Sequence, residues 1–405
     1  MRRVGCLFEQ VVDFHALCAA ARAAVRGRRR KPACARLLFD LETEVLALQR
    51  ELLDGTYRPR PYRTFTVSDP KPRAISAADM RDRVVHHALC TVLEPVFERV
   101  AIFDSYACRP GKGSHAAVRR AREFTRKWPY FLKLDVRKFF ETIPHASLKV
   151  RVRRLVKDPA VLRLVDLIVD HGAPGSEPGR GLPIGNLTSQ HLANLYLAPL
   201  DHLVKERLRV RGYVRYMDDC LLLGASKPEA WAWEAAVRGF VEGVLGLALK
   251  SEATVVAPVS EGVPFLGFRI WPGTTRLDGA RRRRFLRRMY DLGDRCDPGD
   301  REDCHAGDSA RSVVGHAAHA DTLGLRRSLL AGAAAPEGRC GGGTGSNRVK
   351  RGGSWNNDAG NARSANRNNN SPGNRNNTLG FRPSSSGRDG GMAGAERRRS
   401  GAARS

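Results

Sequence analysis

Apolar positions along the first 330 residues recur at two spacings, which separate the predicted helices from the predicted strands. Spacings of three and four residues predict amphipathic helices, at 8–25, 37–53, 79–100, 114–128, 145–171, 182–200, 231–247, 281–288 and 312–330. Short apolar runs bounded by turn residues predict strands at 130–136, 213–217 and 220–223 and a short hairpin at 264–271. Short strands and turns are also expected from residue 61, before the helix at 79–100. The mixture predicts an α+β fold.

The composition changes abruptly after Gly332. A glycine-rich linker is predicted at 333–346, followed by a stretch dense in asparagine. The last residues, 384–405, are rich in Gly, Ser and Arg, which predicts a disordered basic tail. The whole C-terminal part is expected to be poorly ordered.

Charge narrows the classes of partner. The 69 Lys and Arg residues against 42 Asp and Glu give a formal net charge of +27, which favours a polyanion such as nucleic acid. A generally basic surface and an anionic membrane are the alternatives. No apolar stretch approaches the roughly 20 residues of a membrane span. Glu9, Asp13 and His15 interrupt any signal-peptide core, so we expect a cytoplasmic protein without a membrane partner.

The nine cysteines form no CxxC pair, and most are expected to be small core residues with reduced thiols. Cys296 and the Cys304–His305 pair lack zinc-finger spacing. His316, His319 and Asp321 are spaced as a possible metal site, but packing or RNA contact is the favoured interpretation.

Three carboxylates are the strongest candidates for chemistry. Asp135 ends a predicted apolar strand, and Asp218 and Asp219 lie between two strands, at the tip of a predicted hairpin. A polymerase must activate a primer 3′-hydroxyl and stabilise a leaving pyrophosphate. Two Mg²⁺ ions about 3.5–4 Å apart do both, and they require hard oxygen ligands.

The sequence around these carboxylates resembles the reverse transcriptases. The run 213–219 (YVRYMDD) resembles their catalytic hairpin, and 132–140 (LKLDVRKFF) resembles their first carboxylate motif. The resemblance covers most of 60–275 and implies a right-hand polymerase with fingers, palm and thumb, the palm having an antiparallel sheet. It implies an N-terminal helical basic region (1–60), fingers and palm (61–275) and a helical thumb (276–332).

The resemblance also implies roles for other residues. The backbone carbonyl of Val136 is a further metal ligand, and Phe140 is a gate against the ribose 2′-hydroxyl, a core Phe being the alternative. Lys71 and Arg73 hold the triphosphate, a solvated basic loop being the alternative. The remaining assignments are Lys250 near the leaving pyrophosphate, a primer grip of Phe265, Leu266 and Gly267, and the start of the thumb at Arg281–Arg288.

The run 182–190 (LPIGNLTSQ) points to a subfamily. Most reverse transcriptases have Gln where this chain has Ile184, and Pro where it has Gln190. This pattern resembles the enzymes of diversity-generating retroelements, which copy a template-repeat RNA with errors at adenines. Ile184, Gly185 and Gln190 are then nucleotide-binding residues. An apolar Ile184 cannot hydrogen-bond the pair being formed, which predicts loose discrimination.

A C-terminal segment, 347–383, supports the same subfamily. Its runs RGGSWNN, from Arg351, and LGFR, from Leu379, resemble the variable region of targets with a formylglycine-generating-enzyme type of C-type lectin fold. Asparagine codons begin with two adenines and end in a pyrimidine, so mutation of those adenines creates no stop codon. We therefore expect the reading frame to run into or overlap the template repeat. An Asn-rich disordered extension is the alternative.

Other functions remain open. A group II intron enzyme would usually carry a maturase region and often an endonuclease with paired cysteines, and neither is visible. A retron polymerase is disfavoured by the 184–190 pattern, and a catalytically silent RNA-binding protein with a lectin-like tail by the three carboxylates. The expected partners are template RNA, a DNA primer or cDNA, dNTPs and, by resemblance, a small basic accessory protein.

Overall fold

The computed structural model describes residues 2–68, 72–294, 314–325, 348–351 and 367–370. The chain divides into two compact units, the first comprising residues 1–281 and 319–321 and the second the remainder. Lys71, Cys296 and Cys304 lie outside the described residues. So do the whole predicted linker 333–346, the whole predicted tail 384–405 and most of the predicted variable-region-like segment 347–383.

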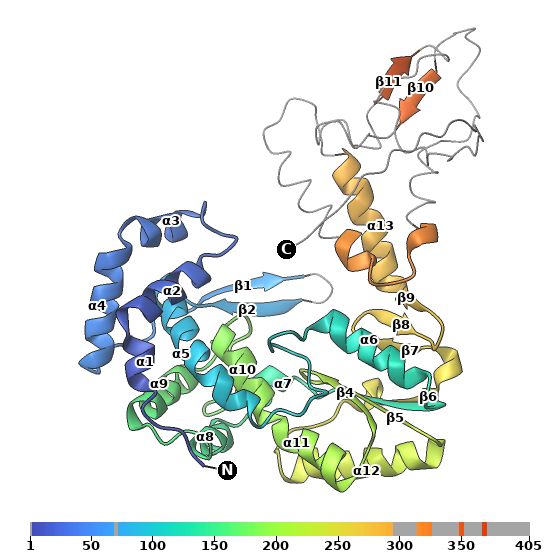
Figure 1. Ribbon diagram of the computed structural model, residues 1–405, viewed down its shortest axis with the longest axis horizontal. Coiled ribbons are helices and arrows are strands. Elements are labelled where there is room, and N and C mark those ends of the chain that lie inside the picture. The colour runs from blue at the N-terminus through green and yellow to red at the C-terminus, as the bar shows by residue number, and fades with distance from the viewer. Residues whose placement is uncertain (1, 69–71, 295–313, 326–347, 352–366, 371–405) are drawn as a thin grey trace, which may run out of the picture. The chain divides into compact units, whose positions relative to one another are not determined.

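The N-terminal region of the first unit is helical (Figure 1). Its helices are α1 (Phe8–Val12), α2 (Phe14–Ala24), α3 (Pro32–Phe39) and α4 (Leu41–Leu53), and α2 packs on α4 and on the long helix α5 (Met80–Glu98). The predicted single helix 8–25 is broken at Asp13, whose side chain accepts a hydrogen bond from Ala16 N (2.8 Å) and so caps α2. Asp is a favoured N-cap residue, so its side chain stabilises the start of a second helix at this position.

An antiparallel hairpin, β1 (Arg63–Val67) and β2 (Arg73–Ala77), follows the N-terminal helices. Its strands are largely exposed, except for Ser76 and its neighbours near the base. Ser76 N donates to the carbonyl of Ile184 (2.9 Å), which connects the hairpin to the loop before α10 (Leu187–Tyr196).

The first unit contains a four-stranded antiparallel sheet in the order β4-β5-β3-β6. Its strands are β3 (Tyr130–Leu134), β4 (Gly212–Tyr216), β5 (Asp219–Gly224) and β6 (Val255–Pro258). The central strands β3 and β5 are mostly buried, as their continuous apolar runs predict. Strand β6 was missed in the sequence because it is short and only partly buried.

Helices α6 (Ser114–Thr125) and α12 (Lys227–Gly243) pack against this sheet. The predicted helix 231–247 was misplaced by four residues. The Ser226 hydroxyl accepts a hydrogen bond from Glu229 N (3.3 Å) and Pro228 lies in the first turn, so capping starts the helix before its apolar stripe begins.

The other helices of the first unit connect the hairpin to the sheet. They are α7 (Phe139–Thr142), α8 (His145–Arg153), α9 (Pro159–Asp170), α10, α11 (Ala198–His202) and a π-helical turn (Leu203–Arg207). The predicted helix 145–171 is therefore two helices, with Asp158 capping the second. The predicted helix at 182 begins instead at Leu187, because Gly185 has a φ of 111° that a helix cannot contain.

A second antiparallel sheet follows, formed by β7 (Val263–Phe265), β8 (Phe268–Ile270) and β9 (Thr275–Leu277). Short 3-10 turns lie at Ser251–Ala253 and Val259–Glu261. Asp321 accepts a hydrogen bond from Thr275 N, and His319 stacks on His115 with ring centroids 3.6 Å apart. These two residues of the suggested metal triad are therefore engaged in packing.

Helix α13 (Gly279–Asp294) begins in the first unit and continues into the second. The described part of the second unit also has helical turns at 314–317 and 323–325, and a hairpin of β10 (Arg348–Arg351) with β11 (Arg367–Asn370).

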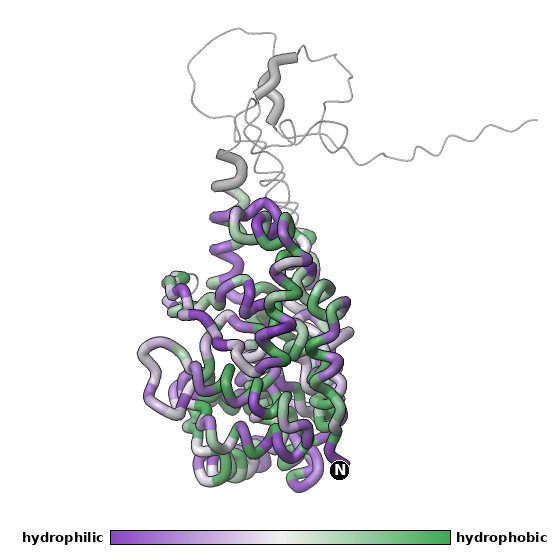
Figure 2. Tube along the Cα trace, turned by 90° about the vertical axis from the view of Figure 1, so that its left-hand side faces the viewer, coloured by the Kyte–Doolittle hydropathy of each residue, from purple (hydrophilic) through white to green (hydrophobic). Residues whose placement is uncertain are grey.

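Short hydrophobic and hydrophilic stretches are interspersed along the part of the chain that Figure 2 colours by hydropathy. Among the described cysteines, four are buried, Cys108 is half-buried and Cys6 is exposed, so most of them are core residues as expected. None of the described helices is both long and apolar enough to cross a membrane.

Candidate active site

The tip of the β4–β5 hairpin presents two adjacent carboxylates. Tyr216 pairs with Asp219 across the hairpin, so Met217 and Asp218 form a two-residue turn. Met217 has a φ of 56°, the positive value that such tight hairpin turns require. Asp218 thus lies in the turn itself, and Asp219 is the first residue of β5.

Asp135 lies opposite this tip because β3 is the neighbour of β5. Leu134 pairs with Cys220, and extending the antiparallel register by one residue brings Asp135 opposite Asp219. Its backbone is fixed from the other side, since Lys250 N donates to the Asp135 carbonyl (2.9 Å) and Val136 forms a bridge with Leu249. Asp135 and the hairpin carboxylates therefore meet at one end of the sheet.

The three carboxylates influence one another electrostatically. Burial, with repulsion from Asp218 and Asp135, raises the pKa of Asp219 to about 7, against the opposing charge of Lys133. Burial and the charge of Asp135 also raise the pKa of Asp218. Raised pKa values show that it is unfavourable for these neighbouring carboxylates to be ionised at the same time. A bound cation would remove that cost, so the site is suited to one.

Basic residues surround the carboxylates. Lys133 Nζ lies 3.5 Å from Asp219 Oδ1, and Lys250 Nζ lies 3.5 Å from Asp135 Oδ2. Arg73, on strand β2, lowers the pKa of Asp218, so the β1–β2 hairpin brings positive charge to the same site. Of the predicted triphosphate ligands, Arg73 is thus near the carboxylates, while Lys71 is outside the described residues.

The residues that the resemblance assigns to binding the incoming nucleotide lie on α7 and around the start of α10. Phe140 is half-buried with its ring edge-on to Phe139 (5.5 Å between centroids). Gly185 is exposed, and a side chain there would place its Cβ 2.8 Å from Ile75 Cγ2. Gln190 Oε1 accepts a hydrogen bond from Cys108 Sγ (3.2 Å).

The predicted primer grip forms the β7–β8 turn. Phe265 is buried, while Leu266 and Gly267 have positive φ values of 49° and 75°. Asp278 N donates to the Gly267 carbonyl (3.1 Å). These residues belong to the three-stranded sheet, which shares no strand with the sheet bearing the carboxylates.

Comparison with known proteins identifies this arrangement. Residues 68–270 match the family model described as reverse transcriptase (RNA-dependent DNA polymerase). The chain belongs to the reverse transcriptase family. The enzyme class of this family is that of RNA-dependent DNA polymerases, as the resemblance implied, and the chain combines helices with antiparallel sheets as expected of an α+β fold.

Relatives of this reverse transcriptase include Protein YkfC of Escherichia coli, 28% identical over 57% of this chain and 72% of YkfC. The group II intron-encoded protein LtrA of Lactococcus lactis is 22% identical over 62% of this chain. The match spans 54% of LtrA, about half its length. A telomerase structure from Candida albicans has a TM-score of 0.42 and 10% identity, covering 60% of this chain and 50% of that one.

A second family model matches the C-terminal part of the reverse transcriptase. Residues 287–384 match the sulfatase-modifying factor enzyme 1-like domain. This match includes the predicted variable-region-like segment 347–383, and it begins within the range predicted as thumb.

The carboxylates of the reverse transcriptase fit a divalent cation by donor type and charge. They supply hard oxygen atoms, and the buried Asp219 Oδ1 accepts no hydrogen bond. Among the described residues, no group of three or more His, Cys, Asp or Glu side chains is gathered closely enough to enclose a metal ion. The ion pairs with Lys133 and Lys250 compensate the carboxylate charge in this arrangement.

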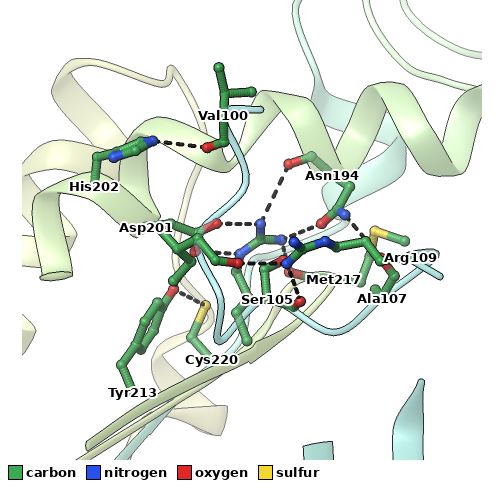
Figure 3. Close-up of polar contacts among 12 residues, drawn as sticks. Val100, Ser105, Ala107, Arg109, Asn194, Asp201, His202, Tyr213, Met217 and Cys220 are labelled. Carbon is green, nitrogen blue, oxygen red and sulfur yellow. Dashed lines mark hydrogen bonds and ion pairs between the residues drawn. The ribbon is translucent and has the colours of Figure 1, made fainter. Parts of the chain in front are cut away.

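A buried ion pair behind the hairpin was missed in the sequence. Arg215, fully buried on β4, donates to both carboxylate oxygens of Asp201 (2.6 Å each). It also donates to Asn194 Oδ1 (2.8 Å) and to the carbonyl of Met217 (3.0 Å), and Tyr213 donates to Asp201 (2.8 Å). Figure 3 shows these partners around one guanidinium. A charged residue within an apolar strand was the available signal.

Proposed function

We propose that this chain copies RNA into DNA, with Asp135, Asp218 and Asp219 as the catalytic carboxylates. The observation that supports this most directly is the register of β3 with β5, which puts Asp135 opposite the hairpin tip. The proposed ligands of two Mg²⁺ ions are these three carboxylates and the Val136 carbonyl. When bound, such ions lower the pKa of the attacking hydroxyl and stabilise the charge of the leaving group.

The basic residues around the carboxylates have proposed roles in substrate binding. Arg73 and Lys71 bind the triphosphate of the incoming dNTP, and Arg73 is supported by its effect on Asp218. Lys250, which pairs with Asp135, exchanges that carboxylate for a pyrophosphate oxygen in this proposal. Cationic side chains aimed at developing negative charge are a main source of catalysis in phosphoryl transfer.

The remaining predicted residues contact the nucleic acid and the sugar in this proposal. Phe140 excludes a ribose 2′-hydroxyl, and Ile184, Gly185 and Gln190 line the new base pair. Phe265, Leu266 and Gly267 hold the primer. The substrates are template RNA, a DNA primer and dNTPs.

Within this family we propose the diversity-generating retroelement type, with synthesis that is error-prone at adenines. Two features support it independently: the 182–190 motif, and the presence of the two family matches on one chain. A small basic accessory protein and a cytoplasmic location belong to this proposal. The similarity to LtrA favours a group II intron type as the second candidate.

Primer extension on an RNA template tests the catalytic proposal. Asp218→Asn keeps the size of the side chain and removes its charge, so Mg²⁺-dependent extension should fall by about 10³-fold, equivalent to roughly 4 kcal/mol of transition-state stabilisation. RNA binding should stay nearly unchanged. Glu242→Gln, at an exposed acid of α12, is the control and should extend normally. Equal extension by Asp218→Asn and the parent chain would refute the site and favour a silent RNA-binding protein.

Sequencing the cDNA products tests the subtype. Gln at position 184 restores a hydrogen-bonding group, so Ile184→Gln should lower misincorporation opposite template adenine by roughly tenfold, the effect of one discriminating contact. Misincorporation opposite template cytosine is the internal control. An unchanged error rate opposite adenine would show that Ile184 does not cause the misincorporation.

A further inference from the structure

A basic cavity lies in the first unit, away from the carboxylates' own strands. It is formed where α2 ends, where α5 passes and where α10 begins, and its volume is about 250 Å³. Its polar lining comprises Arg26, Arg28, Arg83, His86, His87 and Asn186.

No ion pair within the described residues neutralises the positive charge of this cavity, although the charge of Asp79 acts on Arg83. Arg26, Arg28 and Arg83 form no ion pair with any acid among the described residues. Arg83 uses its Nε to donate to the Ala78 carbonyl (2.9 Å). Burial and the neighbouring Arg28 lower the pKa of Arg83. Like charges held together without counter-charges indicate a site for an anion.

Two buried polar atoms at the cavity also lack hydrogen-bond partners. They are Asn186 Nδ2 and His86 Nδ1, on side chains only 3% and 2% exposed. Asn186 Oδ1 accepts from Ala78 N (3.4 Å), which orients its amide NH₂ as the unused donor. A buried donor without a partner costs about 1–3 kcal/mol, so an acceptor is expected there.

The N-terminus of α10 adds to the positive electrostatic potential in the cavity. Asn186 is the N-cap residue, and its side chain does not cap the helix. The first N–H groups of a helix are directed outward and carry partial positive charge, which attracts phosphate oxygens. Arginines, an amide donor and a helix N-terminus thus converge on one cavity.

We propose that this cavity binds a backbone phosphate of the template RNA, ahead of the primer terminus. The inference rests on the proposed function, in which the primer ends at the carboxylates and only the template continues beyond. The cavity shares Gly185 with the proposed nucleotide-contacting loop, and Gly185 lies against Ile75 of β2, the strand that bears Arg73. Its volume is below the roughly 300–1,000 Å³ of pockets that hold drug-sized ligands, so a single phosphodiester fits better than a whole nucleotide.

Binding of the full chain to a primer–template with a single-stranded RNA overhang tests this inference, by fluorescence anisotropy without dNTP. The double variant Arg26→Gln/Arg28→Gln should raise Kd about tenfold and reduce the slope of log K against log salt by about 0.7, the value for one single-strand phosphate. The matched control Arg29→Gln/Arg30→Gln removes the same charge from adjacent exposed positions outside the cavity. It should change Kd by less than about twofold, since it removes only a screened, more distant charge.

A second variant keeps the fold in place. Asn186→Asp retains the acceptor for Ala78 N and a residue favoured at helix starts, while putting negative charge into the cavity. It should weaken binding of the overhang substrate as much as the double variant does, and leave binding of a blunt duplex unchanged.

Several outcomes would overturn the inference. Equal weakening by both arginine pairs would indicate a general basic surface, and equal weakening for overhang and blunt substrates would exclude the template overhang. A rise in KM for dNTP with an unchanged Kd would assign the cavity to a free nucleotide. The Kd measurements need no synthesis and are therefore independent of whether the chain polymerises, whereas the KM comparison requires extension.

Discussion

At the scale of single residues, the conformation of the turn that bears Asp218 depends on the fully buried guanidinium of Arg215. Arg215 holds the carbonyl of Met217 while its charge is neutralised by Asp201. Asp218 follows Met217, whose positive φ is unfavourable for a long side chain. We therefore regard Arg215 as a positioning residue for the turn.

Arg215→Lys tests this role, because lysine keeps the charge but lacks the guanidinium fork. Losing a charged hydrogen bond to Asp201 should cost about 2–3 kcal/mol of unfolding free energy. The kcat of the folded fraction should fall more than the KM for dNTP changes. Arg238→Lys, at a partly exposed pair with Glu234, is the control and should cost under about 1 kcal/mol. A kcat that is normal after correction for the folded fraction would make Arg215 merely structural.

His86 predicts a dependence of stability on pH. Burial, with the charges of His87, Arg83 and His171, lowers its pKa to about 3, whereas an unfolded histidine titrates near 6.5. Between these values only the unfolded state binds the proton, so stability present above pH 6.5 is lost as the pH falls toward 3. The slope from this group is about 1.4 kcal/mol per pH unit at most.

Denaturant unfolding of the nucleic-acid-free protein between pH 4 and 7 measures this effect. The variant His86→Gln lacks the titrating group, so its free energy of unfolding should fall less steeply with acidification than that of the parent chain. Other groups titrate equally in both proteins and cancel in the comparison. Parallel curves would show that His86 is not held neutral.

At the scale of elements, the sequence predicted the pieces that bear an unmistakable local pattern. The apolar strand before Asp135, the hairpin around Asp218 and the long helix α5 are confirmed. In each of these segments the spacing of apolar residues is compatible with only one type of secondary structure. Starts of helices were predicted less well. The starts at Phe14, Leu187 and Lys227 are decided by Asp13, by the φ of Gly185 and by Ser226, not by the apolar stripe.

Features that depend on pairing between segments far apart in the sequence could not be predicted from a single sequence. The register that brings Asp135 opposite Asp219 exists only once β3 lies beside β5. The local pattern and the resemblance therefore identified the three carboxylates as candidates, but neither could show that they meet in space. The same holds for Lys133 and for the basic cavity. Arg26 and Asn186 are 160 residues apart, and only the packing of α2 near the start of α10 brings them to one cavity.

At the scale of the whole molecule, part of the positive charge lies outside the segment of the chain that bears the carboxylates. The reverse transcriptase match ends at residue 270, and the first unit extends only to residue 281 apart from 319–321. Residues 347–405 lie beyond both, and they contain twelve Lys and Arg against three Asp and Glu. Their charge should strengthen nucleic-acid binding without contributing to the carboxylate site.

Removal of residues 347–405 separates these two contributions. At low salt, where the remaining basic residues suffice for binding, the extension rate at saturating template should stay within about twofold of the full chain. As salt rises, the truncated chain should lose template affinity earlier, because its excess positive charge is smaller and screening acts on what remains. A salt titration of primer extension measures both effects. If extension is lost even at low salt and saturating template, the C-terminal segment must complete the polymerase itself, and the division between a catalytic first unit and an appended segment would be wrong.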